Sequence, residues 1–162
     1  MAGAHLLSHG TRQSAPTFMN KPAAKPTPRR EVIADNERAA RQAFELGDNV
    51  SCFLLIHALV EGLLKDFLQR HGKCRFKDLI DDYRSYVKSM CQGPEFVAEL
   101  TAFNKRRNRV VHDLWAHGYT WTNSRQKLVL ACQAGMIMYG LFVEWLETFD
   151  PSITEVGYHY DT

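Results

Sequence analysis

The sequence predicts an all-α protein, an antiparallel bundle of about five helices. Apolar residues recur at the three- and four-residue spacing of helices in five segments. Glycine or proline stands at most of the breaks between these segments, and no convincing strand pattern occurs. The 162 residues suffice for one domain, and 45% hydrophobic with 23% charged residues is typical of a soluble globular protein.

The predicted helices span residues 31–46, 49–71, 76–91, 94–117 and 123–148. The first two end beside Gly47 and Gly72, which suit helix C-terminal caps. The third ends shortly before Pro94, which the fourth helix tolerates in its first turn. Asn123 or Ser124 can cap the start of the fifth. Short connections between these helices favour an antiparallel bundle.

The fifth predicted helix is apolar on most of its circumference, so it needs cover on both sides. Either it lies at the centre of the bundle or one side faces a second copy, and we expect a homodimer. Val129 to Phe149 is apolar enough to raise the question of a membrane. Because this segment contains Gln133, Glu144 and Glu147, we expect a buried helix and no membrane partner.

The bundle is expected to occupy residues 30–150, with a C-terminal tail at 151–162. Residues 1–29 contain four prolines and no periodic apolar pattern, which predicts a disordered basic tail. This tail is either a simple flexible segment or an arm that touches RNA phosphates or a partner. The first 30 residues carry five Lys and Arg and no acid, although the whole chain has a formal charge of +2. Nucleic-acid binding by the folded part must therefore be local.

The four cysteines are far apart in the sequence and form no C-x-x-C pair. This pattern predicts reduced thiols and a cytoplasmic location, with no zinc site. The N-terminus lacks the apolar core of a signal peptide. We expect no metal and no cofactor.

The fourth predicted helix carries an arginine where a buried stripe is expected. On a helical wheel one apolar arc holds Phe96, Leu100, Phe103, Val110, Val111 and Leu114. Arg107 falls inside this arc, and arginine is rarely buried without a partner. Either its stem is buried and its head reaches water, or its head meets an anion at the edge of a cleft.

Beside this arc, Asn104, Asn108 and His112 form a polar row at i, i+4 spacing. Arg107 and His112 are about 140° apart on an ideal helix. They can meet at one phosphate only if the helix kinks or a second copy contributes one of them.

The second predicted helix offers a companion to this site. His57 and Glu61 lie at i, i+4 on the flank of its apolar stripe. Glu61 either pairs with Arg107 and holds it, or pairs with Lys65 in solvent.

These residue types suit phosphodiester cleavage. An arginine fork binds a phosphate and stabilises the charge of a pentacoordinate phosphorus. A histidine can take the proton of a ribose 2′-hydroxyl or give one to the leaving oxygen. Attack by RNA's own 2′-hydroxyl needs no metal, and Lys105, Arg106 and Arg109 would attract phosphates. The alternative is a solvated basic face with a structural histidine.

The segment RNRVVH, Arg107 to His112, resembles the R-x4-6-H motif of HEPN domains in the variant with Asn after Arg. The all-helical context and the stretch HALVEGLLKDFL are also similar to that family, over residues 31–149. The resemblance implies a metal-independent endoribonuclease of toxin–antitoxin, phage-defence or CRISPR type, with one composite cleft in a dimer. It implies that Arg107 and His112 are the catalytic pair, that Asn108 contacts the scissile phosphate, and that Glu61 supports the site.

One position departs from a toxin branch of that family. That branch has a tyrosine two residues after the histidine, which a partner antitoxin nucleotidylates, whereas this chain has Leu114. The predicted partners are RNA, a second copy, and an antitoxin or regulatory protein. The alternatives are a non-catalytic HEPN-like module that binds RNA, a nucleotide or a protein, and a purely structural subunit.

Overall fold

A computed structural model describes residues 29–149. Its helices are α1 (Arg29–Glu45), α2 (Asn49–Phe67), α3 (Phe76–Val87), α4 (Glu95–His117) and α5 (Thr122–Phe149). The predicted all-α bundle is confirmed, and residues 29–149 contain no strand. Apart from Arg29, the tails predicted for residues 1–29 and 151–162 lie outside the described part of the chain.

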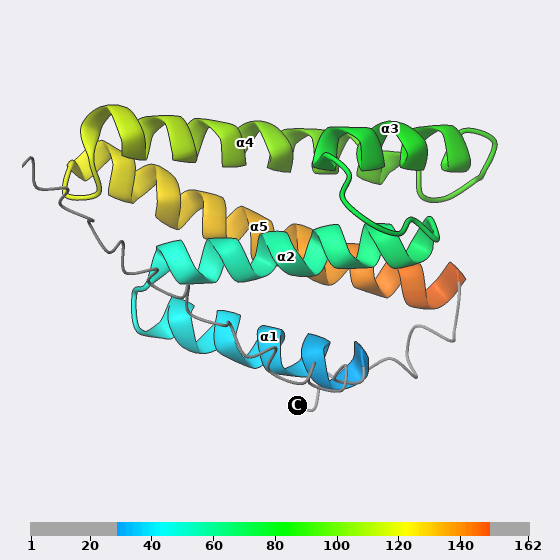
Figure 1. The fold of residues 1–162 in the computed structure, drawn as a ribbon, viewed down its shortest axis with the longest axis horizontal. Coiled ribbons are helices and arrows are strands. Elements are labelled where there is room, and N and C mark those ends of the chain that lie inside the picture. Colours follow the sequence, from blue (N-terminus) through cyan, green and yellow to red (C-terminus); the bar gives the residue numbers. More distant parts are fainter. Residues whose placement is uncertain (1–28, 150–162) are drawn as a thin grey trace, which may run out of the picture.

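Successive long helices run in opposite directions (Figure 1). The helix α5 packs against both α2 and α4, and α1 packs on α2. The shorter α3 contacts α4 and α2 and lies over the first part of α4 (Figure 1). The turn from α4 to α5 therefore lies at one end of the bundle, with the start of α2. The ends of α2, α3 and α5 lie at the other end.

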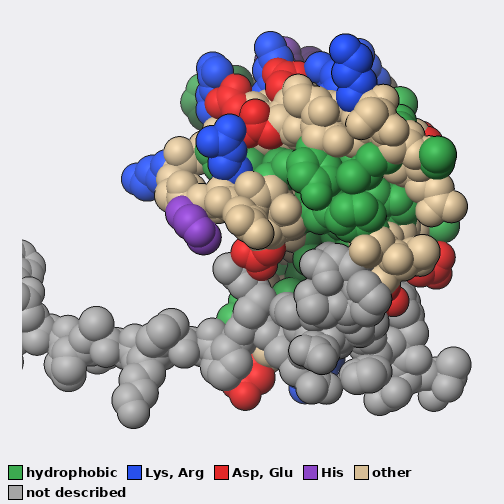
Figure 2. Space-filling view, turned by 90° about the vertical axis from the view of Figure 1, so that its right-hand side faces the viewer, with side chains coloured by type: hydrophobic (Ala, Val, Ile, Leu, Met, Phe, Trp, Pro, Cys, Tyr) green, Lys and Arg blue, Asp and Glu red, His purple; other side chains and the backbone are tan. Residues whose placement is uncertain are grey.

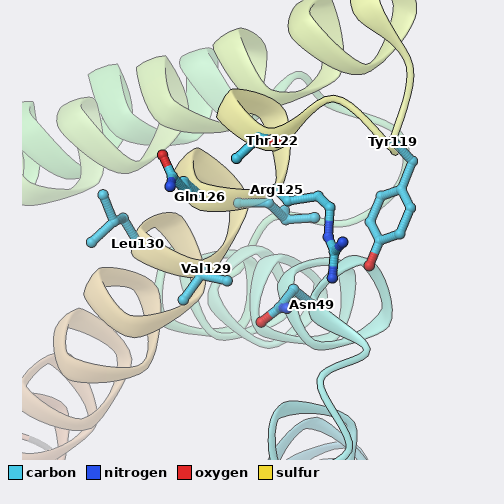
Figure 3. A pocket seen from close by; sticks show the side chains of 8 residues that line it. Asn49, Tyr119, Thr122, Arg125, Gln126, Val129 and Leu130 are labelled. Carbon is cyan, nitrogen blue, oxygen red and sulfur yellow. The ribbon is translucent and has the colours of Figure 1, made fainter.

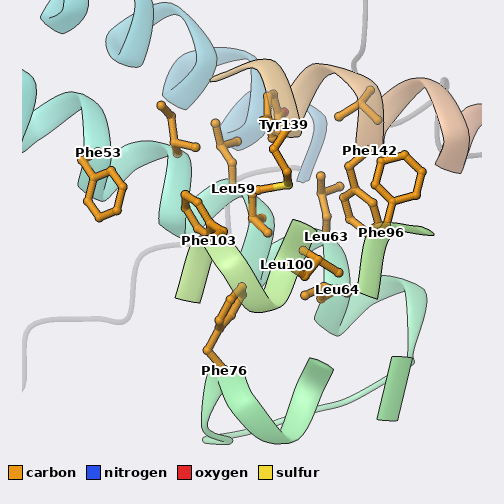
Figure 4. Close-up of a cluster of buried hydrophobic side chains, with 14 of the residues drawn as sticks. Phe53, Leu59, Leu63, Leu64, Phe76, Phe96, Leu100, Phe103, Tyr139 and Phe142 are labelled. Carbon is orange, nitrogen blue, oxygen red and sulfur yellow. The ribbon is translucent and has the colours of Figure 1, made fainter. Parts of the chain in front are cut away.

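The core is built from one continuous cluster of buried apolar side chains (Figure 4). Phe103, near the middle of α4, is fully buried, and its ring packs on that of Phe53 of α2 with centroids 5.5 Å apart. A Cβ atom on Gly135 of α5 would come within 3.1 Å of the Phe103 ring. Glycine at this position lets α4 and α5 approach closely, and burial of a phenylalanine contributes about 1.5–3 kcal/mol.

Aromatic rings fill the end of the bundle where α2, α3 and α5 end. Phe67 packs on Tyr83, Tyr86, Trp145 and Phe149, with ring centroids between 5.0 and 5.9 Å apart. Figure 2 views this end and shows hydrophobic side chains in its middle, with Lys and Arg side chains above them. This packing joins the ends of three helices that are far apart in the sequence.

The connection from α3 to α4 is fixed onto this aromatic end. The buried Tyr83 hydroxyl donates a hydrogen bond of 2.9 Å to the carbonyl of Gly93. Gly93 has φ +100°, a conformation that favours glycine, and a Cβ atom there would lie 2.5 Å from the Trp145 ring. Both the backbone and the available space therefore require glycine at residue 93.

Three predicted helix boundaries were wrong. The helix α2 ends at Phe67, before the predicted residue 71, because Gln69 adopts φ 51° and reverses the backbone ahead of Gly72. The helix α3 ends at Val87, before the predicted residue 91. The helix α5 begins at Thr122, so neither Asn123 nor Ser124 precedes its first residue as a cap.

The helix α5 is covered on two sides and exposed on another. Its contacts with α2 and α4 bury half of its apolar window. By length and composition it is the one helix of residues 29–149 that could cross a membrane. Leu130, Ile137 and Leu141 remain exposed at i, i+7 and i+11 along one face. The expectation of a central helix is therefore met in part, and an apolar face is left without cover inside the protomer.

We expect Gly93→Ala to lower the free energy of unfolding by about 1–3 kcal/mol, because it forces a positive φ on a side chain that also meets Trp145. Chemical denaturation followed by circular dichroism measures this. Gly62→Ala is the matched control, since a Cβ atom at Gly62 meets nothing within 4 Å in a helix interior. The control should be neutral or stabilising by up to about 1 kcal/mol. Equal effects of the two changes would contradict this account.

Candidate functional site

The two halves of α4 have different surroundings. In the first half Phe96, Leu100 and Phe103 are buried beneath α3 and against α5. The helix α3 begins at Phe76, whose ring centroid lies 6.1 Å from that of Phe103. Beyond Phe103, α3 no longer covers α4. In the second half of α4, Val110 stays buried and Leu114 packs against the core, whereas Arg107, Val111 and Trp115 are exposed.

Apolar residues on this uncovered face are exposed. Val111 is 56% exposed and Trp115 is 91% exposed. Arg107, Val111 and Trp115 are spaced four residues apart, so they form one row along the helix. The prediction that Val111 belongs to the buried arc was wrong, because the cover by α3 ends at Phe103, about two turns before it. A row that is apolar and exposed at its far end indicates a binding surface.

Arg107 lies at the start of this row. It is exposed, so the expectation of an arginine inside a buried stripe was wrong. Its angular position was predicted correctly, but α4 has no covering helix there. Its Nη1 atom lies 3.4 Å from the Oδ1 atom of Asn108, a long hydrogen bond to its neighbour in sequence. The guanidinium is thus free to bind an anion from solvent.

His57 of α2 lies beneath Arg107, packed between two rings. Its ring centroid is 4.9 Å from that of Phe76 and 5.9 Å from that of Phe103. Burial lowers the pKa of His57, and the nearby positive charge of Arg107 lowers it further, while Glu61 acts in the opposite direction. His57 is therefore a neutral ring at neutral pH.

Glu61 pairs with two residues of its own helix, α2. Its carboxylate accepts a 2.6 Å hydrogen bond from Lys65 and lies 3.7 Å from Nδ1 of His57. The same hydrogen bond raises the pKa of Lys65. Of the two arrangements that the sequence allowed for Glu61, the structure has the pair with Lys65. Within residues 29–149 no ion pair joins Glu61 to Arg107.

His112 and Asn108 are exposed on the same uncovered half of α4. His112 is near enough to Asp113 to help lower that carboxyl's pKa, after a larger effect of the hydrogen bond from Lys127. Among the described residues no hydrogen bond joins Arg107 to His112. The α4 helix is regular from Glu95 to His117, so a kink does not bring them together. One protomer therefore presents the two groups separately.

The basic residues around the motif are available for phosphates. Lys105 and Arg109 are exposed, and Arg106 is half-buried. None of the three forms an ion pair with another described residue. Across residues 29–149, no three His, Cys, Asp or Glu side chains gather as metal ligands would.

A cavity of about 500 Å³ lies where α5 begins, and sequence reasoning missed it. Its wall includes Asn49 at the start of α2, Tyr119 in the turn after α4, and Arg125 of α5 (Figure 3). The guanidinium of Arg125 points between Tyr119 and Asn49 (Figure 3). The clue in the sequence was the run of aromatic residues Trp115, Tyr119 and Trp121, followed closely by Arg125 and Lys127.

We expect the pKa of His57 to lie below its ordinary 6.5, and Arg107→Gln to raise it by removing a positive charge. NMR titration of the histidine ring protons measures both values. Since folding lowers this pKa, His57 contributes stability fully above the unfolded-state pKa, and this contribution is lost as pH falls through the folded-state pKa. Arg109→Gln is the control with the same loss of charge. Equal shifts from the two variants would contradict the proximity of Arg107 to His57.

Comparisons with known proteins found no relative of this chain. No family model, no curated protein and no solved structure matches the chain.

Proposed function

We propose that the chain is a metal-independent endoribonuclease of HEPN type, acting on RNA in the cytoplasm as a toxin or defence effector. The observation that carries the proposal is the exposure of Arg107, Asn108 and His112 on the uncovered half of α4. A structural arginine or histidine would be paired or packed, whereas these side chains are available to a ligand.

The chemistry follows from the properties of the two side chains. A histidine ring accepts the proton of the ribose 2′-hydroxyl as its oxygen attacks the phosphorus. The bond to the 5′-oxygen breaks, and that oxygen takes a proton from a second acid. The products are a 2′,3′-cyclic phosphate and a 5′-hydroxyl. Arg107 stabilises the additional negative charge on the phosphoryl oxygens, and Asn108 contributes a hydrogen bond to them.

A second copy completes the site in this proposal. Arg107 and His112 are about 140° apart around α4, so one protomer does not direct both at one phosphate. The exposed Leu130, Ile137 and Leu141 of α5 give an apolar face on which copies can associate. The partner's His112 then supplies the base at the phosphate that Arg107 binds, and water supplies the proton that the leaving oxygen takes.

The second candidate is a non-catalytic module that binds RNA. The separation of Arg107 from His112 within one protomer favours it, because phosphate binding needs the arginine alone. An antitoxin or regulatory protein remains a further proposed partner, whose recognition does not use a tyrosine at residue 114.

We expect the purified chain to cut single-stranded RNA in EDTA and to leave DNA intact, since DNA lacks the attacking 2′-hydroxyl. His112→Ala and Arg107→Ala should each reduce cleavage by about a hundredfold or more. Gel electrophoresis with end-group analysis for cyclic phosphate measures this. His71→Ala, which changes another exposed histidine away from α4, is the control. RNA binding without cleavage by the wild type would leave the binding module as the function.

Mixing the two inactive variants tests whether the site is shared between copies. A mixed dimer of Arg107→Ala and His112→Ala chains keeps one site with both wild-type residues when they come from different copies. We therefore expect cleavage to recover in part on mixing, and Ile137→Asp to abolish both dimerisation and cleavage. Sedimentation velocity and the cleavage assay give these two readouts. Full activity of a monomeric Ile137→Asp chain would refute the shared site.

A further inference from the structure

The α4–α5 turn carries a cluster of exposed rings that the proposed chemistry does not use. Trp115 is 91% exposed, and Tyr119 and Trp121 are also exposed. His117 packs its ring 4.2 Å from that of Trp121. We call these four residues the turn surface. Exposed tryptophans are rare on a monomer without a ligand, because burying one ring contributes favourably to folding or binding.

Cations stand over two of these rings. The Nζ atom of Lys127 lies 5.7 Å from the Trp121 ring centroid, and the guanidinium of Arg125 lies 5.9 Å from that of Tyr119. Lys127 also pairs with Asp113 at 2.9 Å. Arg125 has no carboxylate partner among the described residues. Rings interleaved with cations are the arrangement on which unpaired bases stack while the phosphates bind nearby.

The charge of this region fits an anionic polymer. From Asn104 to Gln133 the chain has six Lys and Arg side chains and one acidic residue, Asp113. The rest of the described chain, residues 29–103 and 134–149, is acidic, with 11 Lys and Arg side chains and 14 Asp and Glu side chains. A local excess of positive charge of this kind attracts the backbone of a nucleic acid.

The cavity beside the turn surface adds a place for one base. Asn49 and Gln126 offer amide groups at its wall, and Val129 belongs to its apolar part. Figure 3 shows the Arg125 guanidinium over this space, beside the hydroxyl end of Tyr119. An amide can bond to the edge of a base, an apolar wall packs on its face, and a guanidinium binds the attached phosphate.

We propose that the turn surface and this cavity bind single-stranded RNA through its unpaired bases. The inference rests on the proposed function, and it adds the place on the molecule where the bases of the single-stranded RNA bind. Trp115 follows His112 by three residues on α4, a rise of about 4.5 Å along the axis. A base stacked on Trp115 therefore lies next to the nucleotide whose 2′-hydroxyl His112 would reach. Bases inside a duplex cannot stack on these rings.

The test uses the full chain and a 2′-O-methyl oligonucleotide, which lacks the attacking hydroxyl and so separates binding from cleavage. Fluorescence anisotropy of the labelled oligonucleotide gives the Kd, and quenching of tryptophan emission reports stacking. We expect single strands to bind more tightly than a duplex of equal length. Trp115→Ala and Tyr119→Ala should each weaken binding by about fivefold or more, the effect of losing one stacked base.

Two kinds of control accompany these variants. Trp115→Phe should keep most of the affinity, because a ring remains. Tyr86→Ala removes an exposed ring at the opposite end of the bundle and should leave the Kd unchanged. Since Trp115 is almost fully exposed, its loss leaves no cavity, and circular dichroism should confirm an unchanged fold.

The outcomes separate this inference from the proposed function. If the wild type binds RNA through stacking but does not cut it, the nuclease proposal is wrong and the turn surface is still the RNA-binding site. If the protein cuts RNA and neither Trp115→Ala nor Tyr119→Ala changes its Kd or KM, the assignment of the turn surface is wrong and the nuclease proposal stands. Equal affinity for single strands and duplex would also overturn that assignment. If Trp115→Ala or Tyr119→Ala changes the sedimentation of the protein but not its Kd for the oligonucleotide, the turn surface serves contacts between proteins instead.

Discussion

The unequal lengths of α3 and α4 determine which residues this bundle can offer to a ligand. Twelve residues of α3 extend about 18 Å, whereas the 23 residues of α4 extend about 34 Å. The shorter helix begins at Phe76, beside Phe103, and covers α4 from there toward its start. Every side chain that follows Phe103 on that face lacks cover. The exposure of Arg107, Val111 and Trp115 follows from this single mismatch.

The α2 helix makes the boundary between the covered and uncovered parts of α4 chemically distinct. His57 fills the gap between Phe76 and Phe103, so the last covered position meets a ring that can titrate. Burial is the main cause that lowers the pKa of His57; the charge of Arg107 lowers it further, and that of Glu61 raises it. A phosphate bound at Arg107 would offset the guanidinium charge and make His57 easier to protonate. The buried histidine is thereby coupled to the occupancy of an exposed arginine.

The fold was predictable because helix periodicity and helix breaks are local properties of the sequence. The five helices and their order followed from them, and α5 takes the central place in part, because one of its apolar faces stays exposed. The end of α2 was not predictable in the same way, because Gln69, a residue type that rarely adopts a positive φ, takes the left-handed backbone three residues before Gly72 does. For the site, the wheel gave the correct angle of Arg107 but assumed uniform cover along α4. Whether Glu61 pairs with Lys65 or Arg107 depends on the spacing between two helices, which no single-helix pattern contains.

The aromatic packing that fixes Gly93 and Tyr83 lies at one end of the bundle, and the exposed rings of the α4–α5 turn lie at the other. Resistance to local opening increases with buried contacts, so it is graded along the long axis of the molecule. The anchored end holds the helices in register. The exposed side chains of the opposite end can therefore change conformation without disturbing that register.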